Sequence, residues 1–599
     1  MSLHTAFPVT AILVAIALAG PASGSPKAVE VGDTANPGGL SAAIAAAYAV
    51  GAHEIVIRRG TYVLPKGDRA GLAVRDMKDT VIKARGVDLA FSSTDQDAVD
   101  FTNCENVTFD GPAIHFTHPQ TGQAKIIAIG DDPVKGPYYD VQLCAGFPTD
   151  ATFKSCAIMM GDKPLIRPGS SDFGATSIEP LATTGQARLY LRAVPKGNPW
   201  GVVVGDHVVC RGPGHAMFHT GATTRCTFSN LTLYWSGVFA YFETDGCSGN
   251  RWLGNKLTYG PIPPGATERA LLAQSADGLH SSGSRVGPDI ENCLFEGMLD
   301  DGIAVHGTLY QVAKCSGTTL TLGCRYPRCD FAAGDPIRLA NSETGLIADS
   351  TVVSVKPVEF TPPQISKFGA YKGKLTYYEV AIANAIDAPF DSTAADPARC
   401  GSGFKIIGCT IRNHRARGIL VKADDGVIKG NTVDGSTIAG IVVSPEIYWG
   451  EAGYSRNMLI EGNTIRHTNY AMTGHYYPQA GALTITGEGS MGQRGIRVLN
   501  NTFEGIDCAN IEVRWADGVE IRGNRFLNPF HQPSVTGPVG KSTGVDATAV
   551  IWIGDSKNVT LLDNTVRSMG STGTALVTVA PTASNVTGAG EGQGVRRVR

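Results

Sequence analysis

The sequence predicts an all-β fold, a right-handed parallel β-helix with small antiparallel β barrel or sheet subdomains inserted into it. A short phrase, Asn or Cys followed by a β-branched or apolar strand, recurs along the chain. Several neighbouring copies lie 22 to 25 residues apart, the length of one coil. Two long stretches lack the phrase and instead alternate apolar and polar residues between turn signals, which favours inserted antiparallel sheets.

The recurring phrase marks the coils. Asn tolerates left-handed backbone geometry and its side chain can bond along a stack of identical residues, so a repeated turn Asn suits this architecture. Gaps of 32 to 40 residues between other copies indicate coils with longer loops. We expect at least nine coils, with the two Cys copies inside the stack or its turn ladder. The copies begin at Asn230, Asn255, Cys293, Cys409, Asn431, Asn463, Asn501, Asn524 and Asn564.

The interruptions divide the chain into parts. The stretch GGLSAAIAAAYAVGAHEIVIRRGTYVLP reads as a helix and then a strand, and such a helix would cap the first coil. The tail is rich in Gly, Thr, Ser and Ala, which is typical of disorder. The predicted parts are a signal peptide at 1–24, the cap and first coils at 25–124, an inserted β subdomain at 125–215, β-helix at 216–307, a second inserted β subdomain at 308–400, the C-terminal coils at 401–579 and a disordered tail at 580–599.

The N-terminal segment predicts export. An apolar run from Ala11 to Ala19 is followed by small residues and Pro, as in a secretory signal peptide, and is too short to span a membrane. The preceding MSLHTAF holds no Lys or Arg, so an N-terminal membrane anchor or a misassigned start stays open as an alternative. We expect a secreted or periplasmic protein.

The charge balance narrows the choice of partner. The 599 residues include 51 Lys and Arg against 54 Asp and Glu, a formal net charge of −3 without a long basic block. This balance gives no electrostatic footprint for nucleic acid or for an anionic membrane, so we expect neither as a partner. The expected partner is uncharged or weakly charged, and the oligomeric state is left open. The 13 cysteines cannot all pair, because their number is odd.

One segment carries candidate chemistry. Asp277 lies in SADGLH, and Asp300 and Asp301 lie in LDDGIAVHG, 23 and 24 residues later. That is one coil, so the three carboxylates should meet on one face, about 4.8 Å apart along the stack. Crowded carboxylates raise one another's pKa, and hydrolysis of a glycoside needs one protonated acid beside one ionised carboxylate. The alternative is that Asp-Gly is an ordinary turn signal, but two such turns at coil spacing favour a catalytic trio.

Two histidines accompany the aspartates. His280 lies three residues after Asp277, and His306 lies five residues after Asp301. Both are close enough to bind the substrate or to tune the acids. A purely structural role for either histidine is an equally open alternative.

These motifs carry a family resemblance. The segments ADGLH, ENCLFEGMLDDGIAVHG, HRARGILV and EIYWGEAGYSRNMLIEGNT resemble the β-helical exo-acting α-1,3-galactosidases of glycoside hydrolase family 110, in element order over about residues 35 to 570. The resemblance implies removal of terminal α-1,3-linked galactose with inversion, with Asp277, Asp300 and Asp301 as catalytic residues. It makes Asp300 or Asp301 the proton donor, of which we favour Asp300, and implies no cofactor and no metal.

Later coils supply candidate substrate contacts. Aromatic rings offer apolar faces to sugar CH groups, and charged side chains fix hydroxyls. Trp449 and Glu451 are preferred because they lie in a loop that lengthens one coil. The substrate-binding candidates are His280, His306, Arg417, Glu446, Trp449, Glu451 and Arg514, with Lys422, Glu512 and Trp515 as further possibilities.

Three other functions stay open as alternatives. A polygalacturonase-like hydrolase would share the spacing, but this chain has ADG where that family has NTDG, and it shows no clear Arg-Ile-Lys for a uronate. A polysaccharide lyase on the same fold would need a basic residue and Ca²⁺, which the acidic trio could bind. A carbohydrate-binding solenoid without catalysis would not depend on the aspartates.

Overall fold

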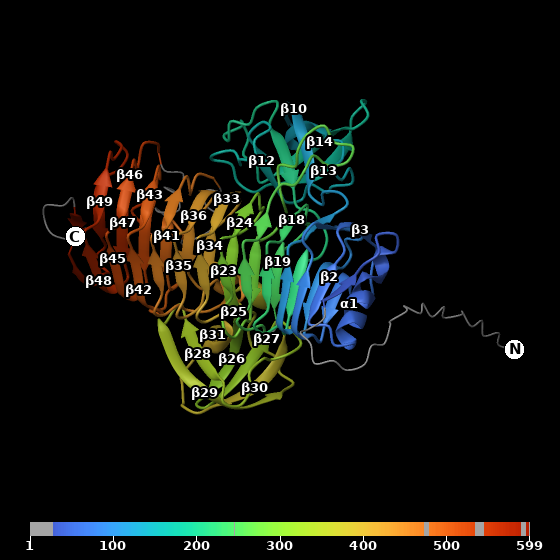
Figure 1. Cartoon of the computed structure of the whole chain (residues 1–599). Helices are drawn as coiled ribbons and strands as arrows, with labels where there is room; N and C mark the ends of the chain where they lie inside the picture. Colours follow the sequence, from blue (N-terminus) through green and yellow to red (C-terminus); the bar gives the residue numbers. More distant parts are fainter. Residues whose placement is uncertain (1–27, 245, 472–478, 534–543, 589–594, 598–599) are drawn as a thin grey trace.

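The computed structural model describes residues 28–244, 246–471, 479–533, 544–588 and 595–597. Within these residues, three long parallel sheets run along the molecule and are built from successive coils, as a parallel β-helix requires (Figure 1). The predicted fold class is confirmed, and sheet A alone contributes 14 described strands, more than the nine coils expected. The predicted signal peptide lies outside the described residues.

Sheets A and B form two of the three faces. Sheet A consists of β1 (Ala28–Val31), β2 (Glu54–Ile57), β5 (Lys78–Lys83), β8 (Glu105–Asp110), β17 (Thr227–Ser229), β20 (Arg251–Leu253), β23 (Asp289–Glu291), β32 (Lys405–Ile407), β35 (Val427–Lys429), β39 (Leu459–Glu461), β42 (Gln493–Leu499), β45 (Ala516–Arg522), β48 (Lys557–Leu562) and β51 (Ser584–Thr587). Sheet B consists of β3 (Gly60–Leu64), β6 (Val87–Phe91), β9 (Ala113–Phe116), β18 (Thr232–Tyr234), β21 (Lys256–Leu257), β24 (Leu294–Glu296), β33 (Thr410–His414), β36 (Thr432–Ser436), β40 (Thr464–Arg466), β43 (Thr502–Glu504), β46 (Arg525–Leu527) and β49 (Thr565–Arg567).

Sheet C forms the face that carries the candidate site. It consists of β4 (Ala70–Arg75), β7 (Asp97–Thr102), β16 (Phe218–Gly221), β19 (Tyr241–Thr244), β22 (Leu279–Ser282), β25 (Ile303–Thr308), β34 (Ile419–Val421), β37 (Ile441–Val443), β41 (Gly481–Thr486), β44 (Ala509–Arg514), β47 (Ala549–Gly554), β50 (Ala575–Val579) and β52 (Val595–Arg597). The short strand β38 (Glu451–Ala452) pairs with β25 in the antiparallel sense.

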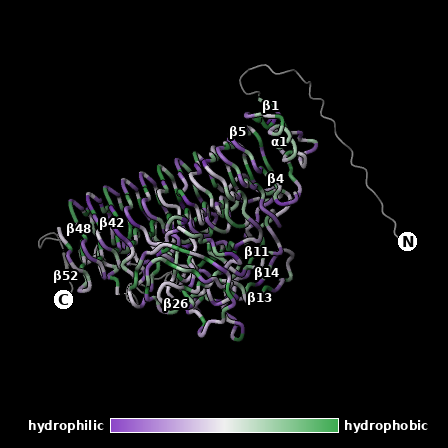
Figure 2. The backbone as a smooth tube through the Cα atoms, turned by 90° about the horizontal axis from the view of Figure 1, so that it is seen from below, coloured by the Kyte–Doolittle hydropathy of each residue, from purple (hydrophilic) through white to green (hydrophobic). Residues whose placement is uncertain are grey.

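The core is one continuous apolar column inside the coils. Alternate residues of each strand point inward, so Ile303 and Val305 join the core while His306 faces outward. The same column includes Val31 near its start and Val579 near its end. Figure 2 shows hydrophobic segments that recur in successive coils along the whole molecule. Burial of apolar residues from every coil therefore fixes which side chains remain on the outer faces.

A ladder of asparagines stabilises the turn between sheets A and B. The Nδ2 groups of Asn431, Asn463 and Asn501 donate to the Oδ1 atoms of the next Asn in the stack at 2.9–3.0 Å. Cys409 precedes this run, and its backbone N–H donates to Asn431 Oδ1 at 2.8 Å. The buried Cys293 lies between β23 and β24, and β24 pairs with β33. Cys293 therefore holds the position equivalent to Cys409 in the adjacent coil. The expected turn ladder is confirmed for these residues.

One member of the proposed repeat was misplaced by one residue. Asn230 has a left-handed backbone, φ 55°, and lies just before the ladder position. Leu231 occupies the ladder position instead, and its N–H donates to Asn255 Oδ1 at 2.9 Å. The Asn in this phrase therefore serves the turn geometry rather than the side-chain stack.

The first insertion is a six-stranded antiparallel sheet with its own small core. It lies beside the middle of the β-helix in Figure 1. In spatial order its strands are β12 (Cys156–Met159), β15 (His207–Cys210), β10 (Gly122–Asp132), β11 (Gly136–Leu143), β14 (Gln186–Arg192) and β13 (Gly174–Pro180).

The second insertion is a closed antiparallel barrel, which confirms the predicted barrel subdomain. It follows β25 directly along the chain and projects from the opposite edge of the β-helix in Figure 1. Its strands, in order, are β26 (Tyr310–Ser316), β27 (Thr319–Cys324), β30 (Thr376–Ile382), β29 (Leu346–Pro357), β28 (Pro336–Asn341) and β31 (Ser392–Ala395). The short 3₁₀ helix η2 (Gly369–Tyr371) lies between β29 and β30, and η3 (Pro397–Arg399) follows the barrel.

A helix covers the N-terminal end of the solenoid, and further strands extend its C-terminal end. Helix α1 (Leu40–Ala49), preceded by η1 (Pro37–Gly39), buries Leu40, Ile44 and Ala47 against the first coil, as expected of a cap. The expected disordered tail is wrong for its described part, because β51 continues sheet A by pairing with β48 and β52 pairs with β50. Val586 packs against the apolar core, which gives this polar stretch a reason to fold. Among the described residues, none of the helices is both long and apolar enough to cross a membrane.

We predict that Asn463→Ala lowers the free energy of unfolding by at least about 2 kcal/mol, because a buried group left without its hydrogen-bond partner costs about 1–3 kcal/mol. Asn463 Oδ1 accepts from both the backbone and side chain of Asn431, and its Nδ2 donates to Ile428 and Asn501. Thermal unfolding followed by circular dichroism measures the change. Asn36→Ala is the control, because Asn36 is exposed and makes no capping bond. Equal losses of Tm in the two variants would contradict the ladder's role.

Candidate active site

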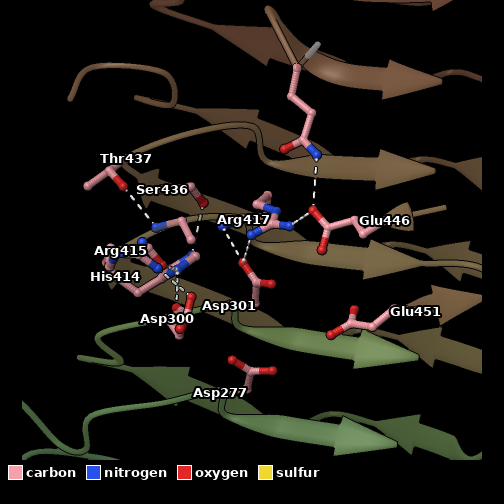
Figure 3. Close-up of polar contacts among 12 residues, drawn as sticks. Asp277, Asp300, Asp301, His414, Arg415, Arg417, Ser436, Thr437, Glu446 and Glu451 are labelled. Carbon is pink, nitrogen blue, oxygen red and sulfur yellow. Dashed lines mark hydrogen bonds and ion pairs between the residues drawn. The ribbon is translucent and has the colours of Figure 1, made fainter. Parts of the chain in front are cut away.

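The three predicted aspartates meet on the outer side of sheet C. Leu279 of β22 lies opposite Ile303 of β25, so Asp277 and Asp301, each two residues earlier, are neighbours in successive coils. One carboxylate oxygen from each of Asp277, Asp300 and Asp301 lies within 4.8 Å of the other two. Figure 3 shows Asp277 one strand away from Asp301, with Arg417 on the next strand. The three aspartates therefore lie together, as their spacing of one coil in the sequence predicts.

Asp301 is a buried member of the trio with a raised pKa. Its exposed fraction is 5%, and burial raises its pKa to about 7. Arg417 lowers this pKa, whereas the negative charges of Asp277 and Asp300 raise it. Arg417 approaches through its backbone N–H, which donates to Asp301 Oδ1 at 2.8 Å, and through its guanidinium at 3.3 Å. A carboxyl with these surroundings holds a proton close to neutral pH.

Asp300 has the opposite electrostatic environment. Burial raises its pKa, but the positive charges of Arg415 and Arg211 outweigh this effect and the net pKa lies below the usual range. Arg415 Nη1 lies 2.5 Å from Asp300 Oδ1, and Arg211 donates to the other oxygen. Asp300 is therefore held as a carboxylate, which runs against our expectation that it is the acid.

The first insertion supplies part of this environment. Arg211 follows β15 of the inserted sheet, and Asp172 of the same insertion binds Arg415 at 2.6 Å. Sequence reasoning missed Arg211, Arg415 and Asp172. Arg415 lies inside the HRARGILV motif and could have been found there, but no local pattern marks Arg211 or Asp172.

Asp277 begins a chain of hydrogen bonds through the two histidines. Asp277 Oδ2 lies 2.7 Å from His280 Nδ1, and His280 Nε2 lies 2.9 Å from His306 Nε2. His306 Nδ1 lies 2.7 Å from the carbonyl oxygen of Gly307. Both histidines therefore lie in the site, as predicted.

The chain determines where the protons lie. A carbonyl only accepts, so His306 Nδ1 carries its hydrogen, and burial lowers the pKa of His306 to about 3, which keeps the ring neutral. Its Nε2 then accepts from His280 Nε2. Burial lowers the pKa of His280, but the bond to Asp277 outweighs this and raises it, while burial raises the pKa of Asp277 despite that bond. The pair is best described as a carboxylate facing an imidazolium that share one proton.

Two glutamates and two basic residues border the trio. Arg417 binds Glu446, and Lys422 Nζ lies 2.8 Å from Glu451 Oε2. Burial raises the pKa of Glu451, but the positive charges of Lys422 and the His280 imidazolium outweigh this effect and hold the pKa far below the usual range. Lys422 is fully buried and directly follows β34, while Glu451 is the first residue of β38. The predicted Arg417, Glu446 and Glu451 therefore join the same network.

Among the described interactions, none links the predicted substrate contacts Trp449 and Arg514 to the aspartate trio. Trp449 ends the 3₁₀ helix η4 (Ile447–Trp449), is half exposed, and its ring meets Tyr448 edge to face. Arg514 lies on β44, three strands beyond β34 in sheet C, where it binds Asp555 at 2.7 Å and stacks on Trp515 at 4.1 Å. The sequence predicts the coils that carry Trp449 and Arg514, but it does not predict the direction in which their side chains point.

Glu512 is a buried carboxyl near these later strands. Burial raises its pKa to about 7, and its Oε2 accepts from the backbone N–H groups of Ala480 and Gly481. These bonds fix the backbone before β41, so the described contacts give Glu512 a structural role.

The acidic trio also has the donor set of a cation site. Calcium takes six to eight oxygen ligands, and each added carboxylate raises its affinity. Here the guanidinium groups of Arg211 and Arg415 occupy the oxygens of Asp300, and Arg417 approaches Asp301. Positive charge already fills the place that a cation would take, so this donor set does not favour Ca²⁺.

We predict opposite effects of two substitutions on stability. The pKa of Asp301 is raised on folding to about 7, so the folded protein keeps a proton that the unfolded chain releases, and stability falls as pH rises from about 4 to about 7. Asp301→Asn removes this cost and should raise Tm relative to wild type at about pH 8. Asp300 has a lowered pKa, so its charge stabilises the fold, and Asp300→Asn should lower Tm at the same pH.

Tm measured across the pH range by circular dichroism tests both statements. If Asp301→Asn loses as much stability above neutral pH as Asp300→Asn, the different protonation of the two residues is contradicted.

Known proteins resemble this chain in fold and in sequence. A family model described as a right handed beta helix region matches residues 382–526. The "Alpha-1,3-galactosidase B" of Phocaeicola vulgatus is 24% identical over 78% of this chain and 81% of its own length. The "Alpha-1,3-galactosidase A" of Streptomyces avermitilis is 26% identical over 48% of this chain and 45% of its own length, so that match spans about half of the relative.

Solved structures show low overall similarity. A Streptococcus pneumoniae surface adhesin, PfbA, aligns with a TM-score of 0.41 and 11% identity over 92% of each chain. The catalytic domain of a GH87 α-1,3-glucanase aligns with a TM-score of 0.39 and 11% identity over 98% of this chain and 70% of that one. The resemblance expected from the motifs is confirmed at the level of sequence: this chain is similar to the α-1,3-galactosidases of the glycoside hydrolase family 110 type.

Proposed function

We propose that this protein is an exo-acting glycoside hydrolase that removes terminal α-1,3-linked galactose from glycans with inversion. The observation that carries the proposal is a trio of carboxylates with oxygens within 4.8 Å of one another, of which one has a raised pKa and another is held ionised. Glycoside hydrolysis needs this division of protonation states between an acid and a base. The named activity of the similar α-1,3-galactosidases supports the substrate.

Asp301 is the proposed general acid. Its raised pKa, about 7, leaves a large share of the carboxyl protonated in neutral solution and lets it donate a proton to the oxygen of the leaving group. Arg417 has two effects: its backbone N–H orients the carboxyl, and its positive charge steadies the carboxylate that remains after proton transfer. The aspartate preferred from the sequence, Asp300, cannot serve as well because two arginines keep it ionised.

Asp277 and Asp300 are the proposed partners of the attacking water. Their oxygens lie at most 4.8 Å apart, and one water with hydrogen bonds of about 2.8 Å spans that gap. The water oxygen bonds to the anomeric carbon as the glycosidic bond breaks. One water proton passes to the carboxylate of Asp277, while the proton of Asp301 ends on the leaving alcohol. His280 holds Asp277 in place and balances its charge, and the neutral His306 orients the His280 ring.

The stereochemical outcome rests on the family resemblance more than on spacing. Inverting pairs typically lie about 6.5–9.5 Å apart and retaining pairs about 5–5.5 Å. The closest oxygens of this trio lie within 4.8 Å, which is compact for an inverting pair. We infer that Asp277 and Asp300 bind one water between them. This water then lies where a nucleophilic carboxylate would have to approach the anomeric carbon, so inversion is compatible with the short separation.

Burial of the charged network supports action on chain ends. His306, Glu446 and Lys422 are at most 7% exposed, and the first insertion contributes Arg211 beside Asp300. We infer that an insertion beside the trio favours one terminal sugar over an internal unit of a long polymer. The basic side chains are already paired with carboxylates, which gives less support to a uronate substrate and to the lyase or polygalacturonase alternatives.

We predict that leaving-group chemistry separates acid from base. Asp277→Asn, Asp300→Asn and Asp301→Asn should each lower kcat on a Gal-α-1,3-Gal disaccharide by about 10²-fold or more, since acid–base catalysis contributes about 10²–10⁴-fold. On 4-nitrophenyl α-galactoside, whose leaving group needs no proton, Asp301→Asn should recover most of its rate while Asp277→Asn should not. Kinetic assays with both substrates measure this split.

Asn36→Ala serves as the folded control and should keep wild-type rates. The assignment of Asp301 as the acid fails if Asp301→Asn is impaired equally on both substrates. No turnover by the wild type, with binding of the disaccharide unchanged in all three variants, would instead favour a non-catalytic binding solenoid.

We predict that the first sugar released is β-galactose, because attack of water opposite the leaving group inverts an α-linkage. Proton NMR of the first turnovers distinguishes the two anomers before mutarotation mixes them. Initial α-galactose would show retention and contradict the shared-water arrangement.

A further inference from the structure

A second cluster of ligand-type side chains lies away from the aspartates. Cys144 follows β11 and His207 begins β15, both in the first insertion, whereas Glu268 belongs to the loop between β21 and β22 of the β-helix. His207 Nε2 lies 3.0 Å from Glu268 Oε2, and Cys144 Sγ lies 3.5 Å from the same oxygen. One ligand atom from each residue lies within 4.8 Å of the others.

The histidine is oriented as a metal ligand is. His207 Nδ1 lies 2.6 Å from the carbonyl oxygen of Gly161, so this nitrogen carries the hydrogen. In the neutral ring, Nε2 then presents a lone pair toward Glu268 and Cys144. Metal-bound histidines nearly always donate their other N–H in this way, which fixes the tautomer and the ring plane.

The order of the three groups argues against Cys144 as a catalytic nucleophile. A Cys-His-Glu catalytic triad needs the imidazole between the thiol and the carboxylate. Here the carboxylate of Glu268 lies between Cys144 and His207.

We propose that Cys144 Sγ, His207 Nε2 and Glu268 Oε2 bind one Zn²⁺, with water as the fourth ligand. Sulfur, imidazole and carboxylate together match the preference of this borderline-soft ion. Zinc bonds of about 2.0–2.3 Å place tetrahedral ligands about 3.3–3.6 Å apart. His207 Nε2 and Cys144 Sγ lie 3.0 and 3.5 Å from Glu268 Oε2, and all three atoms lie within 4.8 Å of one another. On binding, the thiol loses its proton to solvent and the thiolate bonds to the metal.

The proposed metal would join the first insertion to the loop that leads into the acidic trio. Glu268 is followed by Arg269 and Leu271, whose backbone groups already bond to the side chain of Gln123 in β10. His207 is almost fully buried and Glu268 is about one-third exposed, so the cluster opens toward solvent on one side. The role is structural and independent of the proposed hydrolase activity.

Metal binding to the full chain tests this proposal. After removal of metal with a chelator, zinc titrated against a chromophoric competitor should bind one equivalent tightly and raise Tm. Cys144→Ser, His207→Asn and Glu268→Gln should each weaken binding by more than about 10-fold, since loss of even an outer partner costs 10–100-fold. His207→Asn keeps a donor for Gly161, and Cys315→Ser, at another partly exposed thiol, is the matched control.

Cobalt supplies a second, spectroscopic readout of the proposed site. Co²⁺ bound to the wild type should show a thiolate-to-cobalt charge-transfer band, which Cys144→Ser abolishes and Asp301→Asn retains. The proposal is overturned if the wild type binds zinc without that cobalt band, binds less than one tight equivalent, or binds as tightly after Cys144→Ser or His207→Asn.

Discussion

The candidate site depends on the register between successive coils. Parallel strands about 4.8 Å apart place equivalent residues of neighbouring coils side by side, and the apolar column inside leaves no freedom to slip by one residue. Pairing of Leu279 with Ile303 and of Ile303 with Ile419 therefore stacks Asp277, Asp301 and Arg417 in one row. The asparagine ladder holds the same register at the turn between the other two sheets. A site of closely packed charges can persist here because the backbone that carries it cannot relax.

Burial alone would raise the pKa of all three aspartates, and the placement of arginines makes them different. Asp300 receives Arg211 from the insertion and Arg415 from the next coil, so it remains charged. Asp301 receives one backbone N–H and a more distant guanidinium, which does not offset its burial. Asp277 shares a proton with His280, whose partner His306 stays neutral. The same low-polarity environment thus produces an acid, a carboxylate and an ion pair.

Periodic features were predictable from the sequence, and features set by distant contacts were not. The spacing of Asp277 and Asp301 equals one coil, so their meeting followed from strand stacking. The preference for Asp300 as the acid does not take account of Arg211, 89 residues away, because nothing local in the sequence shows that Arg211 docks on Asp300. Asn230 was assigned to the ladder because the phrase NLTL resembles the others, although its backbone places Leu231 there. The tail was expected to be disordered from composition, yet pairing with an existing sheet edge needs only backbone groups and one apolar side chain.

The protonation state of Asp301 is the central claim, and infrared spectroscopy observes it directly. Difference spectra between wild type and Asp301→Asn isolate the C=O band of a protonated carboxylic acid, and its intensity can be followed with pH. The account predicts a band present at about pH 6 that disappears with a midpoint near 7, as burial of Asp301 requires. Absence of that band at about pH 6, or a midpoint near the ordinary value of about 4, would contradict it.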